Sequence, residues 1–357
     1  MEVNWLHLQD FRNLADLKLR PAPGGLTVVL GENGAGKTSL LEAIAYSSTL
    51  KSFRETPRES VIKDGAETAI IRLEADREGR TGLVEISLAR AGRDQVRCNR
   101  QRITRTDDLL ETLRVTVFTP DDLILVKGGP SERRELLDGV LLGVRPRNGD
   151  LRRNVDRVLR HRGTLLRQAG GRLTPDIEST LEVWDNQLAT AGSELAARRE
   201  EIAARLEPAA ADSFRHLTRE RGQLRLRYQR SWTGELMSAL AAARHDDLRR
   251  GVSTIGPHRD DLEITVGELD ARTKLSQGRQ RCATLALRLA SHELVTEAAG
   301  SRPVLLLDDA FSELDPRTSS ALLERLPSGQ AILTTAGSVP AGASPAATVR
   351  IADGTLV

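Results

Sequence analysis

Apolar positions near both ends of the chain follow patterns that predict β-strands. Some segments alternate apolar and polar residues, and others are short apolar runs that fit buried strands. The expected strands cover residues 3–8, 17–19, 26–30, 70–75, 84–89, 115–118, 262–266, 304–307 and 332–335, with further short strands near the C-terminus. Helices are expected from residue 37 and over residues 276–299. The pattern predicts an α/β fold to which both ends of the chain contribute.

Residues 131–250 have a different pattern, rich in Ala, Leu, Arg and Glu and typical of helices. One apolar stripe steps by three and four residues through Leu181, Trp184, Leu188, Ala191 and Leu195. Glycines at 170–171 end the helix before it, and Thr174 with Pro175 can begin the next one. We therefore expect an antiparallel helical arm whose helices have roughly 30 residues and reach about 45 Å. This arm domain, residues 131–250, is inserted into a discontinuous α/β domain formed by residues 1–130 and 251–357.

The composition narrows the class of protein without indicating a partner. The 52 basic and 50 acidic residues nearly cancel, and 3% aromatic residues argue against single-strand binding on stacked aromatic platforms. Cys98 and Cys282 lie far apart and the six histidines lack metal-ligand spacing, which argues against disulfide frameworks and zinc sites. No apolar segment approaches the roughly 18 residues that span a bilayer. We expect a soluble, cytoplasmic protein without a membrane partner.

Residues 31–38, GENGAGKT, match the phosphate-binding pattern GxxxxGK[ST] between an expected strand and an expected helix. Glycines let backbone N–H groups converge on phosphate oxygens, and the helix N-terminus adds a partial positive charge. We expect Lys37 to neutralise the β- and γ-phosphates of ATP and the Thr38 hydroxyl to bind Mg²⁺. The candidate nucleotide-binding residues here are Gly31, Glu32, Asn33, Gly34, Ala35, Gly36, Lys37, Thr38 and Ser39.

The apolar run 304–307 ends in two carboxylates, Asp308 and Asp309. A buried parallel strand delivers such residues to the carboxyl edge of its sheet, where ligands of α/β folds bind. We expect Asp308 to support Mg²⁺ together with Thr38, and Asp309 to orient or deprotonate the water that attacks ATP. Asp309 and Lys37 are therefore the candidate catalytic residues.

Residues 275–280, LSQGRQ, lie just before this strand and are similar to the ABC signature LSGGQ, with Gln277 for the first Gly and Arg279 for Gln. Residues 312–315, SELD, follow Asp309 as the D-loop of ABC ATPases does. The order of these motifs is typical of ABC ATPases, and P-loop kinases and GTPases lack it. An ABC signature lies far from its own P-loop, so we expect Ser276 and Gly278 to contact ATP in trans, on a second subunit.

Further segments resemble the RecF family, bacterial recombination mediators of the SMC/Rad50-like ABC branch. They are FRN at 11–13, PDDLILVKGGP at 120–130 followed by Arg133, Arg134, Leu137 and Asp138, GPHRDDL at 256–262, and LDDAFSELD at 307–315. Leu136 departs from the family's pattern, which usually has an aromatic residue there. Thr334 and Thr335 replace the switch His of ABC transporters, and a transporter-type Gln loop is not evident.

The resemblance implies an ABC-type ATPase head and an ATP-dependent DNA-binding protein of recombinational repair. Such a protein binds duplex, gapped or junction DNA and, with RecR and RecO, helps to load recombinase onto single-stranded DNA. ATP and Mg²⁺ would hold a homodimer, and slow, DNA-dependent hydrolysis would act as a switch. Arg12 and Asn13 are implied nucleotide contacts, with a structural role in a turn as the alternative. His258 and Arg259 either face phosphates or stabilise their own loop.

Other classes of protein share parts of this motif set. The main alternative is a short-armed SMC-like structural DNA clamp, although SMC arms run to hundreds of residues. A transporter ATPase would need a membrane partner, and a small-molecule kinase would be monomeric with ATP. A basic run on the first arm helix predicts salt-sensitive, sequence-independent duplex binding, with a solvated helix face as the alternative. It comprises Arg152, Arg153, Arg157, Arg160, Arg162 and Arg167.

Overall fold

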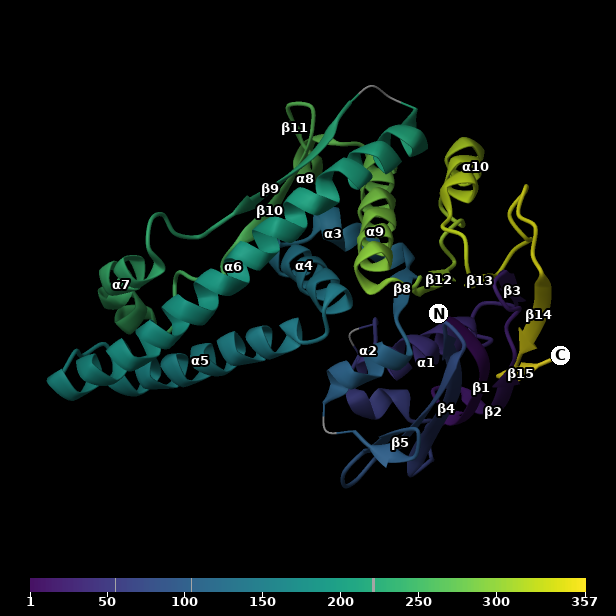
Figure 1. The fold of residues 1–357 in the computed structure, drawn as a ribbon, viewed down its shortest axis with the longest axis horizontal. Helices are drawn as coiled ribbons and strands as arrows, with labels where there is room; N and C mark the ends of the chain where they lie inside the picture. The colour runs from purple at the N-terminus through teal and green to yellow at the C-terminus, as the bar shows by residue number, and fades with distance from the viewer. Residues whose placement is uncertain (55, 104, 220–221) are drawn as a thin grey trace.

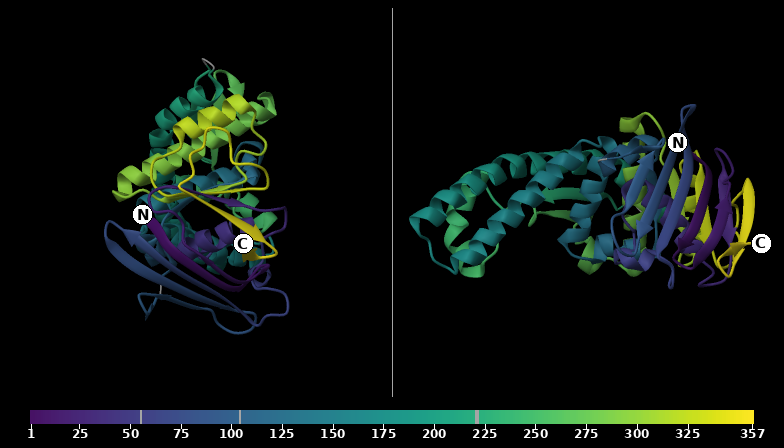
Figure 2. Two further views of the ribbon diagram at one scale, coloured as in Figure 1. Left: turned by 90° about the vertical axis from the view of Figure 1, so that its right-hand side faces the viewer. Right: turned by 90° about the horizontal axis from the view of Figure 1, so that it is seen from below.

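A head of two large sheets and a protruding helical arm make up the molecule (Figures 1 and 2). The computed structural model describes residues 1–54, 56–103, 105–219 and 222–357. Both ends of the chain lie in the head (Figure 1). Strand β3 (Leu26–Leu30) pairs in parallel with β13 (Ala331–Thr335) on one side and β14 (Ala347–Ala352) on the other. This pairing confirms the expected α/β fold made from both ends of the sequence.

The parallel sheet carries the strands that end at the candidate site. Its order is β15-β14-β3-β13-β12-β8. The remaining strands are β8 (Val115–Phe118), β12 (Val304–Asp308) and β15 (Thr355–Leu356), of which β15 is antiparallel to β14. Every residue of β12 is buried, as its uninterrupted apolar run predicts.

The antiparallel sheet forms the outer layer of the head. Its order is β2-β1-β4-β5-β6-β7. The strands are β1 (Glu2–Phe11), β2 (Leu14–Leu19), β4 (Thr68–Arg77), β5 (Arg80–Ala89), β6 (Gln95–Cys98) and β7 (Gln101–Arg102). Alternate side chains of β4 and β5 are buried, in agreement with the period of two in their sequence. One hydrophobic core joins both sheets to the helix α1 (Lys37–Thr49) that lies between them.

Helices α4 (Pro130–Val144), α5 (Asn148–Ala169), α6 (Pro175–Thr218) and α7 (Leu236–Arg250) extend from the head. Gly170 ends α5 in the left-handed conformation, and the Thr174 hydroxyl caps α6 with Pro175 at its first position. Four of the five residues of the predicted stripe are buried. Leu188, Ala191 and Leu195 lie in one core with the half-buried Trp184 against it, and Leu181 lies in a smaller core with residues of α5 and α7. Within the described residues, no helix is long and apolar enough to cross a membrane.

Two expectations about residues 131–250 are wrong. The arm helices are unequal, because α5 has 22 residues and α6 has 44, or about 66 Å at 1.5 Å per residue. A strand, β9 (Leu224–Gln229), also lies in the stretch predicted to be helical, and it pairs with β10 (Asp261–Val266). Its apolar residues alternate with arginines at a period of two, which is a strand pattern. The part of the helical prediction at 220–221 lies outside the described residues.

Further elements complete the head and its junction with the arm. They are α2 (Leu109–Thr112), α3 (Ile124–Lys127), β11 (Leu269–Asp270), α8 (Ala271–Lys274), α9 (Gln277–Ala299) and α10 (Pro316–Arg325). Helix α6 packs along α9, and α9 packs on β8 of the parallel sheet. A single hydrophobic core therefore runs from the arm into the head. The domain boundaries at 130/131 and 250/251 stay predictions.

Candidate nucleotide-binding site

The glycine-rich loop between β3 and α1 has the backbone of a phosphate cradle. Gly34 and Gly36 have φ angles of 83° and 111°, which residues with a side chain rarely adopt. A Cβ on Gly31 would lie 2.4 Å from the backbone oxygen of Ile351, so the loop also needs glycine for its close packing. Among the residues that the structure describes, no side chain caps the first turn of α1. Its N–H groups are consequently free to bind an anion.

Lys37 lies across this loop. Its ammonium donates hydrogen bonds of 2.8 Å to the backbone oxygens of Gly31 and Glu32, and the residue is 8% exposed. These contacts hold the positive charge against the backbone of the loop. The arrangement suits a polyphosphate, whose oxygens would complete the shell of the ammonium.

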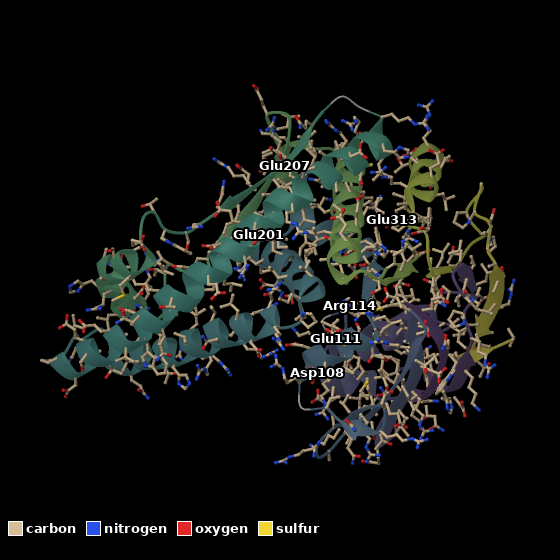
Figure 3. All side chains as sticks on the ribbon, in the orientation of Figure 1. Asp108, Glu111, Arg114, Glu201, Glu207 and Glu313 are labelled. Carbon is tan, nitrogen blue, oxygen red and sulfur yellow. The ribbon has the colours of Figure 1, made fainter. Side chains whose placement is uncertain are left out.

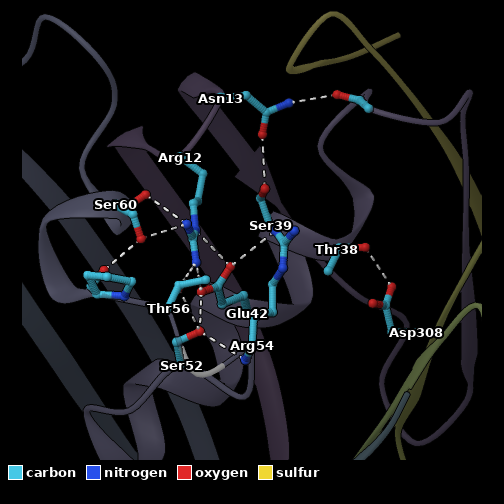
Figure 4. A network of polar contacts seen from close by, with 12 residues as sticks. Arg12, Asn13, Thr38, Ser39, Glu42, Ser52, Arg54, Thr56, Ser60 and Asp308 are labelled. Atoms are coloured by element: carbon cyan, nitrogen blue, oxygen red, sulfur yellow. Dashed lines mark hydrogen bonds and ion pairs between the residues drawn. The ribbon is translucent and has the colours of Figure 1, made fainter. Parts of the chain in front are cut away.

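The two expected Mg²⁺ ligands meet at the carboxyl edge of the parallel sheet. The Thr38 hydroxyl donates to Asp308 Oδ1 at 3.0 Å, and the Thr334 hydroxyl donates to the same oxygen at 2.7 Å (Figure 4 shows the first bond). Burial raises the pKa of Asp308, and the nearby Asp309 carboxylate raises it further, while both hydroxyls act in the opposite direction. One hydroxyl and one carboxylate fit Mg²⁺, which binds few protein oxygens and keeps the rest for phosphate and water.

Asp309 begins the turn that follows β12. Its backbone has a φ of 46°, and its N–H donates to the backbone oxygen of Thr334 at 3.1 Å. Ser312 donates from its hydroxyl to the Asp309 backbone oxygen at 2.9 Å, which closes the turn. A left-handed aspartate held by bonds from both sides is a backbone strain typical of functional sites. Its role in activating water stays a prediction.

Asn13 and Arg12 have different relations to the P-loop (Figure 4). The Asn13 amide donates to the backbone oxygen of Gly34, and its oxygen accepts from Ser39, each at 2.9 Å. Asn13 thus braces the cradle. Arg12 donates to the buried carboxylate of Glu42 at 2.6 and 3.0 Å and to the backbone oxygen of Ser60. These bonds favour the structural alternative for Arg12, whose contact with nucleotide stays a prediction.

Arg54 is a residue near the site that the sequence analysis missed. Its guanidinium lies 3.9 Å from the Glu42 carboxylate, and its charge lowers the pKa of Asp308. The side chain is 44% exposed, so it is free to reorient toward an anion. Its position shortly after the P-loop helix was a usable signal, but no motif singled it out.

The signature residues lie at the N-terminal end of α9. Ser276 is the N-cap of α9 and accepts a 3.4 Å hydrogen bond from the backbone N–H of Arg279. Gly278 has open space where a Cβ would lie. Helix α8, just before Ser276, packs on α3, β10, β11 and α9, whereas α1 lies between the two large sheets (Figure 1). The fold therefore does not bring the signature to the P-loop of the same chain.

The D-loop is tied to the signature helix. Glu313 forms an ion pair with Arg281 of α9, and Arg281 also donates to the backbone oxygen of Glu313 at 3.0 Å (Glu313 is labelled in Figure 3). Asp315 caps α10 by accepting from the N–H groups of Arg317 and Thr318. The acidic residues after Asp309 thus hold the turn between β12 and α10.

His258 and Arg259 stabilise their own loop. Both side chains contact the backbone oxygen of Ser253, His258 through Nε2 at 3.0 Å and Arg259 at 3.2 Å. Burial lowers the pKa of His258 to about 4, so the ring is uncharged at neutral pH. These contacts favour the loop-stabilising alternative over a phosphate contact.

The basic run on α5 is only partly available to a ligand. Arg162 is fully buried and forms ion pairs with Asp185 at 2.7 Å and Asp247 at 2.6 Å, so its inclusion in a DNA-binding surface is wrong. Arg152 and Arg153 are engaged with carboxylates of neighbouring elements. Three arginines of the run, Arg157, Arg160 and Arg167, have exposed side chains. None of these three forms an ion pair with another described residue. The sequence alone does not distinguish Arg162 from an exposed arginine, because its acidic partners lie far away along the chain.

Comparisons with known proteins identify the family. The model of the RecF/RecN/SMC N terminal domain matches residues 2–337. The chain is 40% identical over 352 residues to the DNA replication and repair protein RecF of Streptomyces avermitilis, covering 94% of this chain and 93% of that protein. It is 38% identical to the RecF of Frankia alni, with the same coverage. The chain belongs to the RecF family. This confirms the resemblance carried by the segments at 120–130, 256–262 and 307–315.

Solved structures agree with the RecF family. A recombination mediator protein RecF with ATP, in the RecFOR pathway, has a TM-score of 0.91 and 26% identity, and the match covers 100% of this chain and 97% of that one. The corresponding complex with ATPrS has a TM-score of 0.90 and 26% identity, with 99% and 97% covered. An SmcHead bound to the C-winged helix domain of ScpA has a TM-score of 0.59 and 17% identity, covering 100% and 96%, and shares the fold alone. The expected ABC-type ATPase head with a helical insertion is therefore confirmed.

Proposed function

We propose that this chain binds ATP with Mg²⁺ and uses slow hydrolysis as a switch for DNA binding in recombinational repair. The observation that carries the proposal is the contact between Thr38 of the P-loop helix and Asp308 of β12, which brings a hydroxyl and a carboxylate together beside the glycine-rich loop. Membership of the RecF family supports the repair role. The RecF structures with ATP and ATPrS support the choice of nucleotide.

Each residue of the site has a proposed part in this chemistry. The backbone N–H groups of the loop and Lys37 bind the phosphates, while Thr38 and Asp308 hold Mg²⁺. The metal would neutralise charge that develops on the phosphate oxygens. Asp309, one residue beyond Asp308, orients or deprotonates the attacking water. The missing switch His leaves Thr334 bonded to Asp308, which is consistent with slow turnover.

The active form in this proposal is a homodimer closed by ATP. Ser276 and Gly278 lie at the N-terminus of α9, away from α1 of the same chain. A helix N-terminus binds anions, so the signature of one subunit would contact the γ-phosphate bound by its partner. Two such sites related by a two-fold axis would complete the dimer.

DNA and the other members of the pathway are the proposed partners. Arg157 and Arg160 line a hollow on α5 together with Asp150 and Asp156, and they offer sequence-independent phosphate contacts. The RecFOR pathway named for the similar structures suggests RecR and RecO, with recombinase loading on single-stranded DNA as the outcome. The DNA in this proposal is double-stranded, gapped or junction DNA.

The test is the oligomeric state of the chain with and without ATP and duplex DNA, measured by sedimentation at fixed salt. We expect a monomer without nucleotide and a dimer with ATP and Mg²⁺. The ATPase rate, measured separately, should rise when DNA is added. A monomer under all four conditions would contradict the proposal. A dimer that forms equally well without ATP would contradict its use as a switch.

A further inference from the structure

Arg133 joins two segments that lie behind the signature motif. Its Nε and Nη2 donate to the two carboxylate oxygens of Asp261, at 2.7 and 2.9 Å, and its Nη1 donates to the backbone oxygen of Gly128 at 3.0 Å. Gly128 ends α3, Arg133 lies on α4 and Asp261 begins β10. Arg133 is 5% exposed. The two RecF-like segments at 120–130 and 256–262, which the nucleotide site does not use, meet through this side chain.

Helix α8 rests on both elements that Arg133 joins. It packs against α3 and against β10, and it ends at Lys274, directly before the signature loop. The buried amide of Gln280, in the first turn of α9, donates to the backbone oxygens of Ala271 and Arg272 at 3.0 and 2.9 Å. These hydrogen bonds couple the position of α8 to that of the N-terminus of α9, where Ser276 lies.

The surroundings of the pair fix its geometry. A bidentate Arg–carboxylate contact sets direction as well as distance. The next residue, Asp260, is fully buried and accepts from the Tyr228 hydroxyl at 2.5 Å and from the backbone N–H of Ser231 at 2.8 Å. Arg134 donates to the Asp260 backbone oxygen at 2.7 Å. These hydrogen bonds therefore fix the start of β10 relative to α4.

We propose that the Arg133–Asp261 pair positions Ser276 for the ATP bound by a second subunit. The inference rests on the proposed ATP-dependent dimer. Donors at a helix N-terminus act on a phosphate only when the helix is correctly aimed, and small displacements weaken such contacts strongly. The pair touches neither ATP nor Mg²⁺, so Arg133 and Asp261 are positioning residues.

Two conservative variants test the pair. Asp261→Asn keeps the shape and removes the charge, and Arg133→Lys keeps the charge and removes the fork. Each should weaken ATP-dependent dimerisation at least about fivefold. The ATP affinity of the monomer, titrated below the dimerisation concentration, should stay at the wild-type value. The double variant should dimerise with ATP no less tightly than the more weakly dimerising single variant, because both substitutions break the same interaction.

A matched control lies on the same strand. Glu263 of β10 pairs with Arg227 of β9 at 2.7 Å, and the Arg227 side chain is 71% exposed. Glu263→Gln also removes one carboxylate charge from β10. It should dimerise with ATP as the wild type does.

Several results would overturn the inference. Wild-type dimerisation by both variants would do so, as would an equal loss of monomer ATP affinity, since that would make the pair a general support of the fold. Thermal unfolding shows whether Asp261→Asn folds, and Arg133→Lys carries the test alone if it does not. If the wild type fails to dimerise with ATP, or Ser276→Arg still dimerises, the proposed function fails whatever the Asp261 result.

Discussion

The Thr38 hydroxyl and the Asp308 carboxylate lie 3.0 Å apart although 270 positions separate them in the sequence. Parallel pairing of β3 with β13, and of β13 with β12, brings the two ends of these strands to one sheet edge. The insertion of the arm between them lengthens the connection without moving the site. The two proposed Mg²⁺ ligands thus come together because the topology of the head, rather than any local sequence, places them there.

Asp309 and Lys37 should separate hydrolysis from binding. Asp309→Asn keeps the side-chain shape and removes the base, so hydrolysis should fall about 100-fold while ATP binding and the dimer remain. Lys37→Met removes a charge-assisted contact worth about 1.5–3 kcal/mol and should lose ATP affinity, the dimer and ATP-dependent DNA retention together. Steady-state ATPase rate and DNA dwell time check both variants. Wild-type hydrolysis by Asp309→Asn would mean that another group activates the water.

The arginines of α5 should divide into DNA contacts and a structural residue. Arg157→Gln and Arg160→Gln should each weaken duplex binding and reduce the slope of log affinity against log salt by about 1. Arg162→Met, five residues beyond Arg157 on the same helix, should instead cost about 3–5 kcal/mol of unfolding free energy, because the buried Asp247 would lose its cation and the buried Asp185 would keep only Arg244. Salt titrations and chemical denaturation measure the two effects. A salt slope unchanged in both exposed variants would remove α5 from the DNA surface.

His292 should make the stability of the fold sensitive to acid. Burial lowers its pKa to about 4, with Arg302 adding to the effect, and its Nδ1 contacts the Thr116 hydroxyl at 3.0 Å. Below pH 6.5, the ordinary pKa of histidine, His292 binds a proton in the unfolded chain and stays neutral in the folded chain. The unfolding free energy should therefore fall as pH drops from 6.5 to about 4, by at most about 1.4 kcal/mol per pH unit for this group.

His292→Gln should flatten that part of the pH profile. His245→Gln on the exposed surface of α7 is the control, since its side chain is hydrated in both states. Urea unfolding at a series of pH values gives the two slopes. Identical slopes for His292→Gln and the wild type would show that another group causes the acid sensitivity.

The sequence was most informative where chemistry needs adjacent residues. The P-loop, the Asp308–Asp309 pair and the Ser276 cap each depend on one short segment, and the structure places them on the expected elements. Arg162 was mistaken for a surface residue because its partners, Asp185 and Asp247, come from two later helices. Strand β9 was missed because its alternation is flanked by helical sequence. Contacts set by tertiary packing were thus the ones that local patterns could not show.

The proposed dimer depends on the trans arrangement of the ATP site, which can be tested by mixing two inactive variants. Lys37→Met damages the P-loop, and Ser276→Arg damages the signature while leaving ATP binding intact. If each site combines residues of two subunits, a mixed dimer holds one undamaged site, formed by the P-loop of the Ser276→Arg chain and the signature of the Lys37→Met chain. We predict that the mixture regains ATP hydrolysis that neither variant shows alone. A mixture as inactive as its separate components would contradict the account.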